Sequence, residues 1–181
     1  MSLSLLATVN QASGDTYGDW LQGCCGSRHW CRLMSESRPI ASTQQWHEQA
    51  DAAFDRLSSQ DWIEAFESHP KIGDVDSLRM KFAGNDKWSG HEQSGVADAS
   101  EDVVERLANA NEVYQRKFGY IFIVCATGKT ASEMLDLLDH RIRNDALREL
   151  EVAAAEQRKI THLRIDKLIA ELSASETNPA E

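Results

Sequence analysis

The sequence has few chain-breaking residues and no long apolar run. Only three prolines and ten glycines occur among its 181 residues, so no linker is visible and the length suits one compact domain. No stretch approaches the roughly eighteen apolar residues of a membrane-spanning helix. The start of the chain, Met1 to Leu6, lacks the basic segment and apolar core of a signal peptide. We therefore expect a cytoplasmic protein that does not bind membranes.

Basic residues are also few. The chain has 19 Lys and Arg against 29 Asp and Glu, which gives a formal net charge of −10. Nucleic acids and anionic membranes select for basic surfaces, so neither is an expected partner. A small-molecule substrate fits this composition better, and an anionic one would need a local arginine or lysine.

Metal and nucleotide motifs are incomplete. The four cysteines lack the Cys-x-x-Cys spacing of structural zinc sites. The triplet Gly128-Lys129-Thr130 is similar to the end of a phosphate-binding loop, but the first glycine of that loop would fall at Ile123. The pair His91-Glu92 is similar to the start of a zinc-protease helix, but the second histidine would fall at Gly95. No metal or cofactor is therefore expected.

Apolar residues recur at helical spacing along most of the chain. Ser42 is a predicted helix cap, and the apolar face that follows it consists of Trp46, Ala50, Ala53, Phe54 and Leu57. A further helix, with Trp62, Ile63 and Phe66, leads to His69. The pattern also predicts a helix from Ser100 to Lys117, a capping box of Thr130 and Glu133, and a last helix over residues 145–172.

One segment departs from the helical pattern. Gly119 to Ala126 is a β-branched and aromatic run, which favours a buried extended conformation near residues 120–126. No second strand is available to pair with it, so we expect its backbone amides to bind another partner, for which a ligand is a natural candidate. The predicted fold is all-α, a single-domain helical bundle of residues 1–172 with one buried extended segment and a disordered tail at 173–181.

His69 is the leading candidate for catalysis. Pro70 follows it and restricts its backbone, so the imidazole should lie at a helix end with its orientation largely fixed. Glu92 supplies a carboxylate between glycines, and an imidazole with a carboxylate is the minimum equipment for acid–base chemistry near neutral pH. The alternative is that His69-Pro70 only ends a helix and Glu92 is a solvated charge. The other helical histidines, His29, His47, His140 and His162, are interpreted as bystanders.

Several short motifs together resemble one family. These are HPKIGD at 69–74, SGHEQSG at 89–95, KFGYIFIVCA at 117–126, KITHLRI at 159–165, and Cys24-Cys25-Gly26-Ser27 followed by Trp30 and Arg38-Pro39. In this order they are similar to the decarboxylases of 2-oxo-4-hydroxy-4-carboxy-5-ureidoimidazoline (OHCU), which yield (S)-allantoin in urate breakdown. The resemblance covers residues from about 3 to 168 and implies a lyase that needs no cofactor and forms a homodimer.

The resemblance also implies roles for individual residues. His69 would be the acid–base group, and Glu92 would orient it and favour its protonated form. Ser89 and Gln93 would bind the ureido and ring amide groups, and Pro70 would pack on the ring. The remaining substrate-binding positions would be the backbone amides that read the urea-like edge, at Phe122, Ile123, Val124, Cys125 and Ala126.

Arg164 shares a helical face with Ile160 and Leu168 and is therefore expected to point inward. Without the resemblance, a buried ion pair with an acid is an equal alternative. With it, the planar guanidinium becomes the clamp for the substrate's carboxylate or polar ring edge. Two other functions stay open, a hydrolase of a related ureide and a helical interaction domain whose pocket would lack an inward histidine or arginine.

Overall fold

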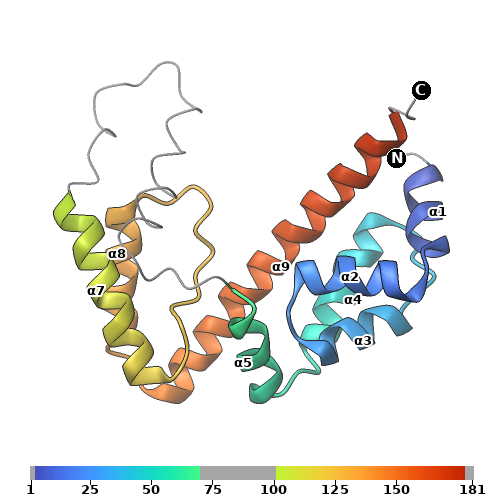
Figure 1. The fold of residues 1–181 in the computed structure, drawn as a ribbon. Helices are drawn as coiled ribbons and strands as arrows, with labels where there is room; N and C mark the ends of the chain where they lie inside the picture. Colours follow the sequence, from blue (N-terminus) through green and yellow to red (C-terminus); the bar gives the residue numbers. More distant parts are fainter. Residues whose placement is uncertain (1–2, 70–100, 178–181) are drawn as a thin grey trace. The chain divides into compact units, whose positions relative to one another are not determined.

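The computed structural model describes residues 3–69 and 101–177 and is all-α over these ranges (Figure 1). The helices are α1 (Leu3–Gln11), α2 (Gly14–Cys24), α3 (Arg28–Glu36), α4 (Thr43–Phe54), α5 (Ser59–Glu67), α7 (Glu101–Phe118), α8 (Ala131–Arg141) and α9 (Ala146–Thr177). The predicted fold class is thereby confirmed. Within the described ranges, no helix is long and apolar enough to cross a membrane.

Side-chain caps fix where several helices begin. The Ser42 hydroxyl accepts a hydrogen bond from the Gln45 amide at 3.0 Å, as predicted for the start of α4. Thr130 and Glu133 form the predicted capping box at α8. A second capping box, of Ser58 and Asp61, starts α5. Each cap satisfies amides that have no partner within the helix. The caps therefore define the residue at which short helices such as α5 begin.

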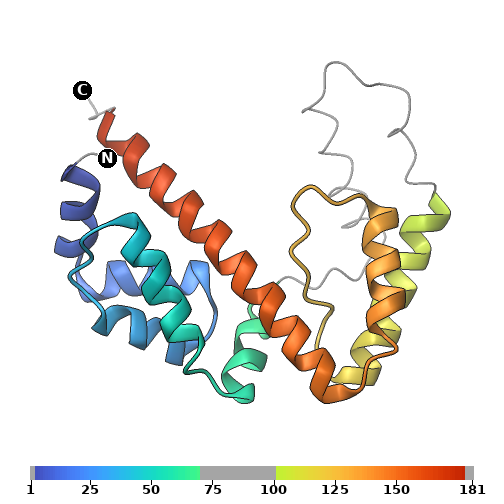
Figure 2. The same cartoon turned by 180° about the vertical axis from the view of Figure 1, so that it is seen from behind.

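Contacts divide the chain into two compact units, and the sequence gives no sign of this division. The first unit contains the residues up to His69 and those from Ala154 onward. In it, α9 lies alongside the group formed by α1 to α5, as both views show (Figures 1 and 2). Its core is rich in large aromatic side chains, and Trp30 donates a hydrogen bond from Nε1 to the Ala50 carbonyl at 3.1 Å.

The second unit ends at Ala153. Its helices α7 and α8 run in the same direction side by side, and the segment between them returns along them without regular structure (Figures 1 and 2). Gly119 ends α7 with a φ of +83°, a conformation that favours glycine. Tyr120, Phe122, Ile123 and Val124 are buried, as the apolar run predicted.

Two features differ from the expectation. Helix α1 was not predicted, because its buried apolar residues Leu5 and Val9 make only one helical spacing. Helix α9 continues to Thr177, five residues beyond the predicted end at Leu172. No proline interrupts this stretch, and the Ser173 hydroxyl donates to the Ile169 carbonyl at 2.7 Å.

Candidate active site

His69 lies directly after the end of α5, as predicted. Ser68 caps this helix, and the His69 amide donates to the Phe66 carbonyl at 3.1 Å. A β-carbon on Gly26 would lie 2.3 Å from Cβ of Ser68, so only glycine permits this close approach. The Gly26 of the Cys-Cys-Gly-Ser motif thus lets the loop after α2 pack against the residue that precedes the histidine.

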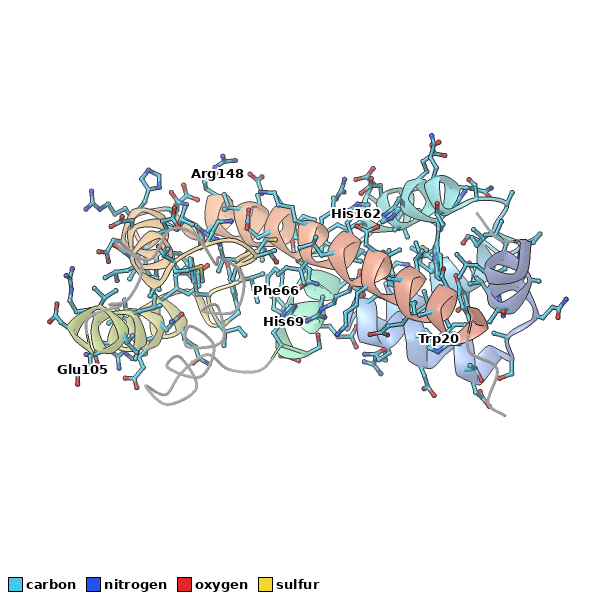
Figure 3. The ribbon with its side chains drawn as sticks, turned by 90° about the horizontal axis from the view of Figure 1, so that it is seen from above. Trp20, Phe66, His69, Glu105, Arg148 and His162 are labelled. Atoms are coloured by element: carbon cyan, nitrogen blue, oxygen red, sulfur yellow. The ribbon has the colours of Figure 1, made fainter. Side chains whose placement is uncertain are left out.

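The imidazole of His69 faces α9. Its Nε2 lies 2.6 Å from Oε1 of Gln157, and its Nδ1 lies 3.4 Å from an NH2 nitrogen of Arg164. Figure 3 shows His69 beside α9, next to Phe66 at the end of α5. The structure therefore brings together two predicted site residues, His69 and Arg164, that are 95 positions apart in the chain.

Arg164 is half-buried rather than fully inward-facing. The same guanidinium donates to the carbonyl oxygens of Gly23 and Cys24, each at 3.4 Å. Arg164 forms no ion pair with any described residue. The alternative role, a buried salt bridge with an acid, is therefore not observed among these residues. The backbone carbonyls of α2 hold the arginine beside His69 without neutralising its charge, which suits a group that binds an anion.

Gln157 and Thr161 were missed by sequence reasoning. Both are buried, at 0% and 2% exposure, one turn apart on α9. Buried polar side chains need partners, and these two lie on the same face as the apolar residues Ala153, Ala154 and Ile165. That interruption of an apolar face, spaced four residues apart, is the signal that would have identified them.

The remaining predicted site residues fall into two groups. Pro70, Ser89, Glu92 and Gln93 lie outside the described residues, and their roles stay predictions. Phe122 to Ala126 belong to the second unit. There the Arg141 guanidinium donates to the Ile123 carbonyl at 2.8 Å and stacks 4.6 Å from the centre of the Phe122 ring. Among the described residues, the backbone amides of Phe122, Ile123 and Val124 donate no hydrogen bond.

The other histidines and the buried thiols have structural surroundings. His47 and His162 stack between α4 and α9, with their Nδ1 atoms 2.7 Å apart and an aspartate within 2.9 Å of each Nε2. His29 contacts Asp61 at 3.1 Å. Burial raises the pKa of the Cys24 thiol to about 12 and that of Cys25 to about 11, so neither provides a thiolate nucleophile near neutral pH.

Comparisons with known proteins point in one direction. A family model described as OHCU decarboxylase matches residues 10–166. The uric acid degradation bifunctional protein of Arabidopsis thaliana is 38% identical over 148 residues, which cover 82% of this chain and 46% of that protein. This chain therefore spans about half of that bifunctional protein. The OHCU decarboxylase of Xenopus laevis is 26% identical to this chain. The alignment covers 88% of this chain and 91% of that protein.

Two solved structures are also similar to this chain. A crystal structure of an OHCU decarboxylase in the presence of (S)-allantoin is 36% identical, with a TM-score of 0.69 over 84% of this chain and 98% of that one. A crystal structure of an (S)-allantoin synthase is 18% identical, with a TM-score of 0.63 over 90% of this chain and 53% of that one. At 18% identity, the similarity to the (S)-allantoin synthase shows a shared fold and nothing more.

Proposed function

The chain belongs to the OHCU decarboxylase family, and on that premise we propose that it decarboxylates OHCU to (S)-allantoin in urate degradation, with His69 as the acid–base group. The observation that carries the proposal is the approach of His69 to Arg164, which puts a proton-transfer group beside a cation that has no acidic partner among the described residues. An interaction domain with a degenerate pocket would have lacked this pairing.

The substrate supplies its own electron sink. Its carboxylate is attached to a carbon next to a ring C=N bond. When the bond to the carboxylate breaks and CO₂ leaves, the electron pair moves toward the imine nitrogen, which takes up a proton. A proton is then added to the carbon that bears the ureido group, and the neighbouring hydroxyl loses its proton as a carbonyl forms. The protein must therefore hold the carboxylate out of the ring plane and direct proton transfer to one face.

The two residues have separate tasks in this scheme. The Arg164 guanidinium binds the carboxylate, because a planar cation with several N–H donors matches a carboxylate's geometry. His69 transfers the proton at the reacting carbon or its hydroxyl. Glu92 remains the proposed partner that orients His69, and Ser89, Gln93, Pro70 and the amides of residues 122–126 remain proposed contacts of the substrate. A homodimer likewise remains a proposal.

The activity is tested by generating OHCU in place from urate, since it decays spontaneously. We expect the loss of its absorbance and the release of CO₂ to accelerate in proportion to protein concentration. A loss rate equal to that of the protein-free control at every concentration would contradict the proposal. Release of ammonia or urea in place of CO₂ would instead identify a ureide hydrolase.

Arg164→Lys is expected to act on binding. Lysine keeps the charge but loses the two-pronged geometry, and a hydrogen bond between charged groups contributes about 1.5–3 kcal/mol. We expect KM to rise about ten-fold or more, with kcat changed much less. Arg158→Lys is the matched control, because Arg158 is also on α9 but pairs with Asp51 and Asp55. An unchanged KM in Arg164→Lys would remove the arginine from the proposed site.

A further inference from the structure

Gln157 contacts His69, the proposed proton-transfer group, directly from a fully buried position, although no sequence motif pointed to it. Its Oε1 lies 2.6 Å from Nε2 of His69, and its Nε2 lies 3.3 Å from Oγ1 of Thr161. The Thr161 hydroxyl is itself 3.0 Å from the Gln157 backbone carbonyl. His69, Gln157 and Thr161 thus form a continuous hydrogen-bonded chain within the first compact unit.

The positions of the protons in this chain follow from what each group can do. The Thr161 hydroxyl has one hydrogen, and the Gln157 backbone carbonyl accepts it. The Thr161 oxygen must therefore accept from the Gln157 side-chain NH₂, which leaves the amide oxygen of Gln157 facing His69. With the amide reversed, the Thr161 hydroxyl could bond to the amide oxygen only by giving up its hydrogen bond to the Gln157 backbone carbonyl. Since the amide oxygen only accepts, Nε2 of His69 must carry a hydrogen.

The other side of the imidazole gives the same result independently. Arg164 approaches Nδ1 at 3.4 Å, and a guanidinium only donates. In neutral His69, Nδ1 must therefore be the nitrogen without a hydrogen. Both contacts specify the same tautomer, with the hydrogen on Nε2 and the lone pair on Nδ1.

We propose that Gln157 is a positioning residue that fixes this tautomer, so that His69 gains and loses its catalytic proton only at Nδ1. The proposal rests on the function proposed above. Because Nε2 donates to Gln157 in both the neutral and the protonated imidazole, this nitrogen does not take part in the transfer. Proton exchange is thereby confined to the side of the ring that faces Arg164, where the anionic part of the substrate binds.

The tautomer can be measured without any reaction. Long-range ¹H–¹⁵N correlation spectra of the ¹⁵N-labelled protein distinguish the two ring nitrogens of each histidine, and the signals absent from His69→Asn belong to His69. At a pH where His69 is neutral, we expect the hydrogen on Nε2 and none on Nδ1. A hydrogen on Nδ1, or an even mixture of both forms, would overturn the proposal.

This measurement separates the two proposals. If the protein does not consume OHCU but His69 shows the Nε2–H form, the proposed function fails while the role of Gln157 in fixing the ring is retained. If the protein is active and His69 shows the Nδ1–H form, only the inference on Gln157 fails.

Variants then connect the tautomer to turnover. Gln157→Leu removes the acceptor, so we expect a mixture of tautomers and a fall in kcat of about ten-fold or more, within the range of acid–base contributions, with KM unchanged. Gln157→Glu keeps an acceptor and adds a negative charge near the imidazole, which favours its protonated form. In that variant the limb of the pH–rate profile that reports His69 should move to higher pH. A role in folding alone would not shift this limb, so an unmoved limb would overturn the proposal.

Two substitutions of Thr161 form a matched pair of variants in which His69 and Gln157 are unchanged. Thr161→Ser keeps the hydroxyl and should keep both the Nε2–H form and the kcat of the unmodified protein. Thr161→Val removes the hydroxyl that orients the amide, so the Gln157 side chain can reverse and a mixture of tautomers should appear. Equal behaviour of the serine and valine variants in both the spectra and kcat would contradict the assigned orientation.

Discussion

Replacing His69 with asparagine is expected to lower kcat by about 10²-fold or more, because a positioned acid–base group typically contributes 10²–10⁴-fold. The fold should survive. His69 is half-buried after the end of α5, where its backbone amide already bonds to the Phe66 carbonyl. KM should change little, since Arg164 and not His69 is the proposed ligand of the carboxylate. Initial rates on OHCU generated in place, at saturating concentration, measure the effect.

His140→Asn is the control for this experiment. His140 is an exposed histidine on α8, so the same substitution there should leave kcat at the value of the unmodified protein. Circular dichroism at 222 nm would show that both variants keep their helices. Near-normal turnover by His69→Asn would show that the imidazole does not carry the proton.

The largest effect on stability is expected from Glu149→Gln. Glu149 is fully buried and accepts hydrogen bonds at one oxygen from Arg141 at 2.6 and 2.9 Å and from the Tyr114 hydroxyl, and at the other from Asn144 at 2.7 Å. Burial, followed by the bond to Glu149, raises the pKa of Tyr114, which therefore stays a donor. A glutamine would turn an NH₂ group toward these donors and leave the Arg141 charge uncompensated.

Removing one partner of a buried ion pair costs about 3–5 kcal/mol, and we expect a loss of that size in the free energy of unfolding of Glu149→Gln. Urea denaturation followed by circular dichroism measures it. Glu151→Gln is the matched control on the same helix, because the Glu151–Arg148 pair is exposed and should contribute less than about 1 kcal/mol. Equal stability of the two variants would show that the buried pair does not hold the second unit together.

The local features of the fold could be predicted from sequence because they depend on neighbours in the chain. Ser42 and Thr130 cap helices through residues three positions away. His69 was predicted to lie at a helix end because a proline follows it in the sequence. The apolar run around Phe122 was predicted to be buried because its composition alone favours that state.

Contacts between distant residues could not be predicted in this way. Gln157 contacts His69, which lies 88 positions away in the chain, and Arg141 on α8 donates to the Ile123 carbonyl in the segment between α7 and α8. A helical pattern shows which face is apolar, but it does not show which polar residue on that face has a partner. Gln157 was missed for this reason, and Arg164 was placed further inside than it is.

The central claim is tested most directly by the handedness of the product. OHCU is generated in place from urate, with and without the protein, and the circular dichroism of the allantoin formed is followed over time. The account predicts a signal of one sign that grows with protein concentration and corresponds to (S)-allantoin, because protonation is directed to one face of the carbon. A time course identical to that of the protein-free control would contradict it.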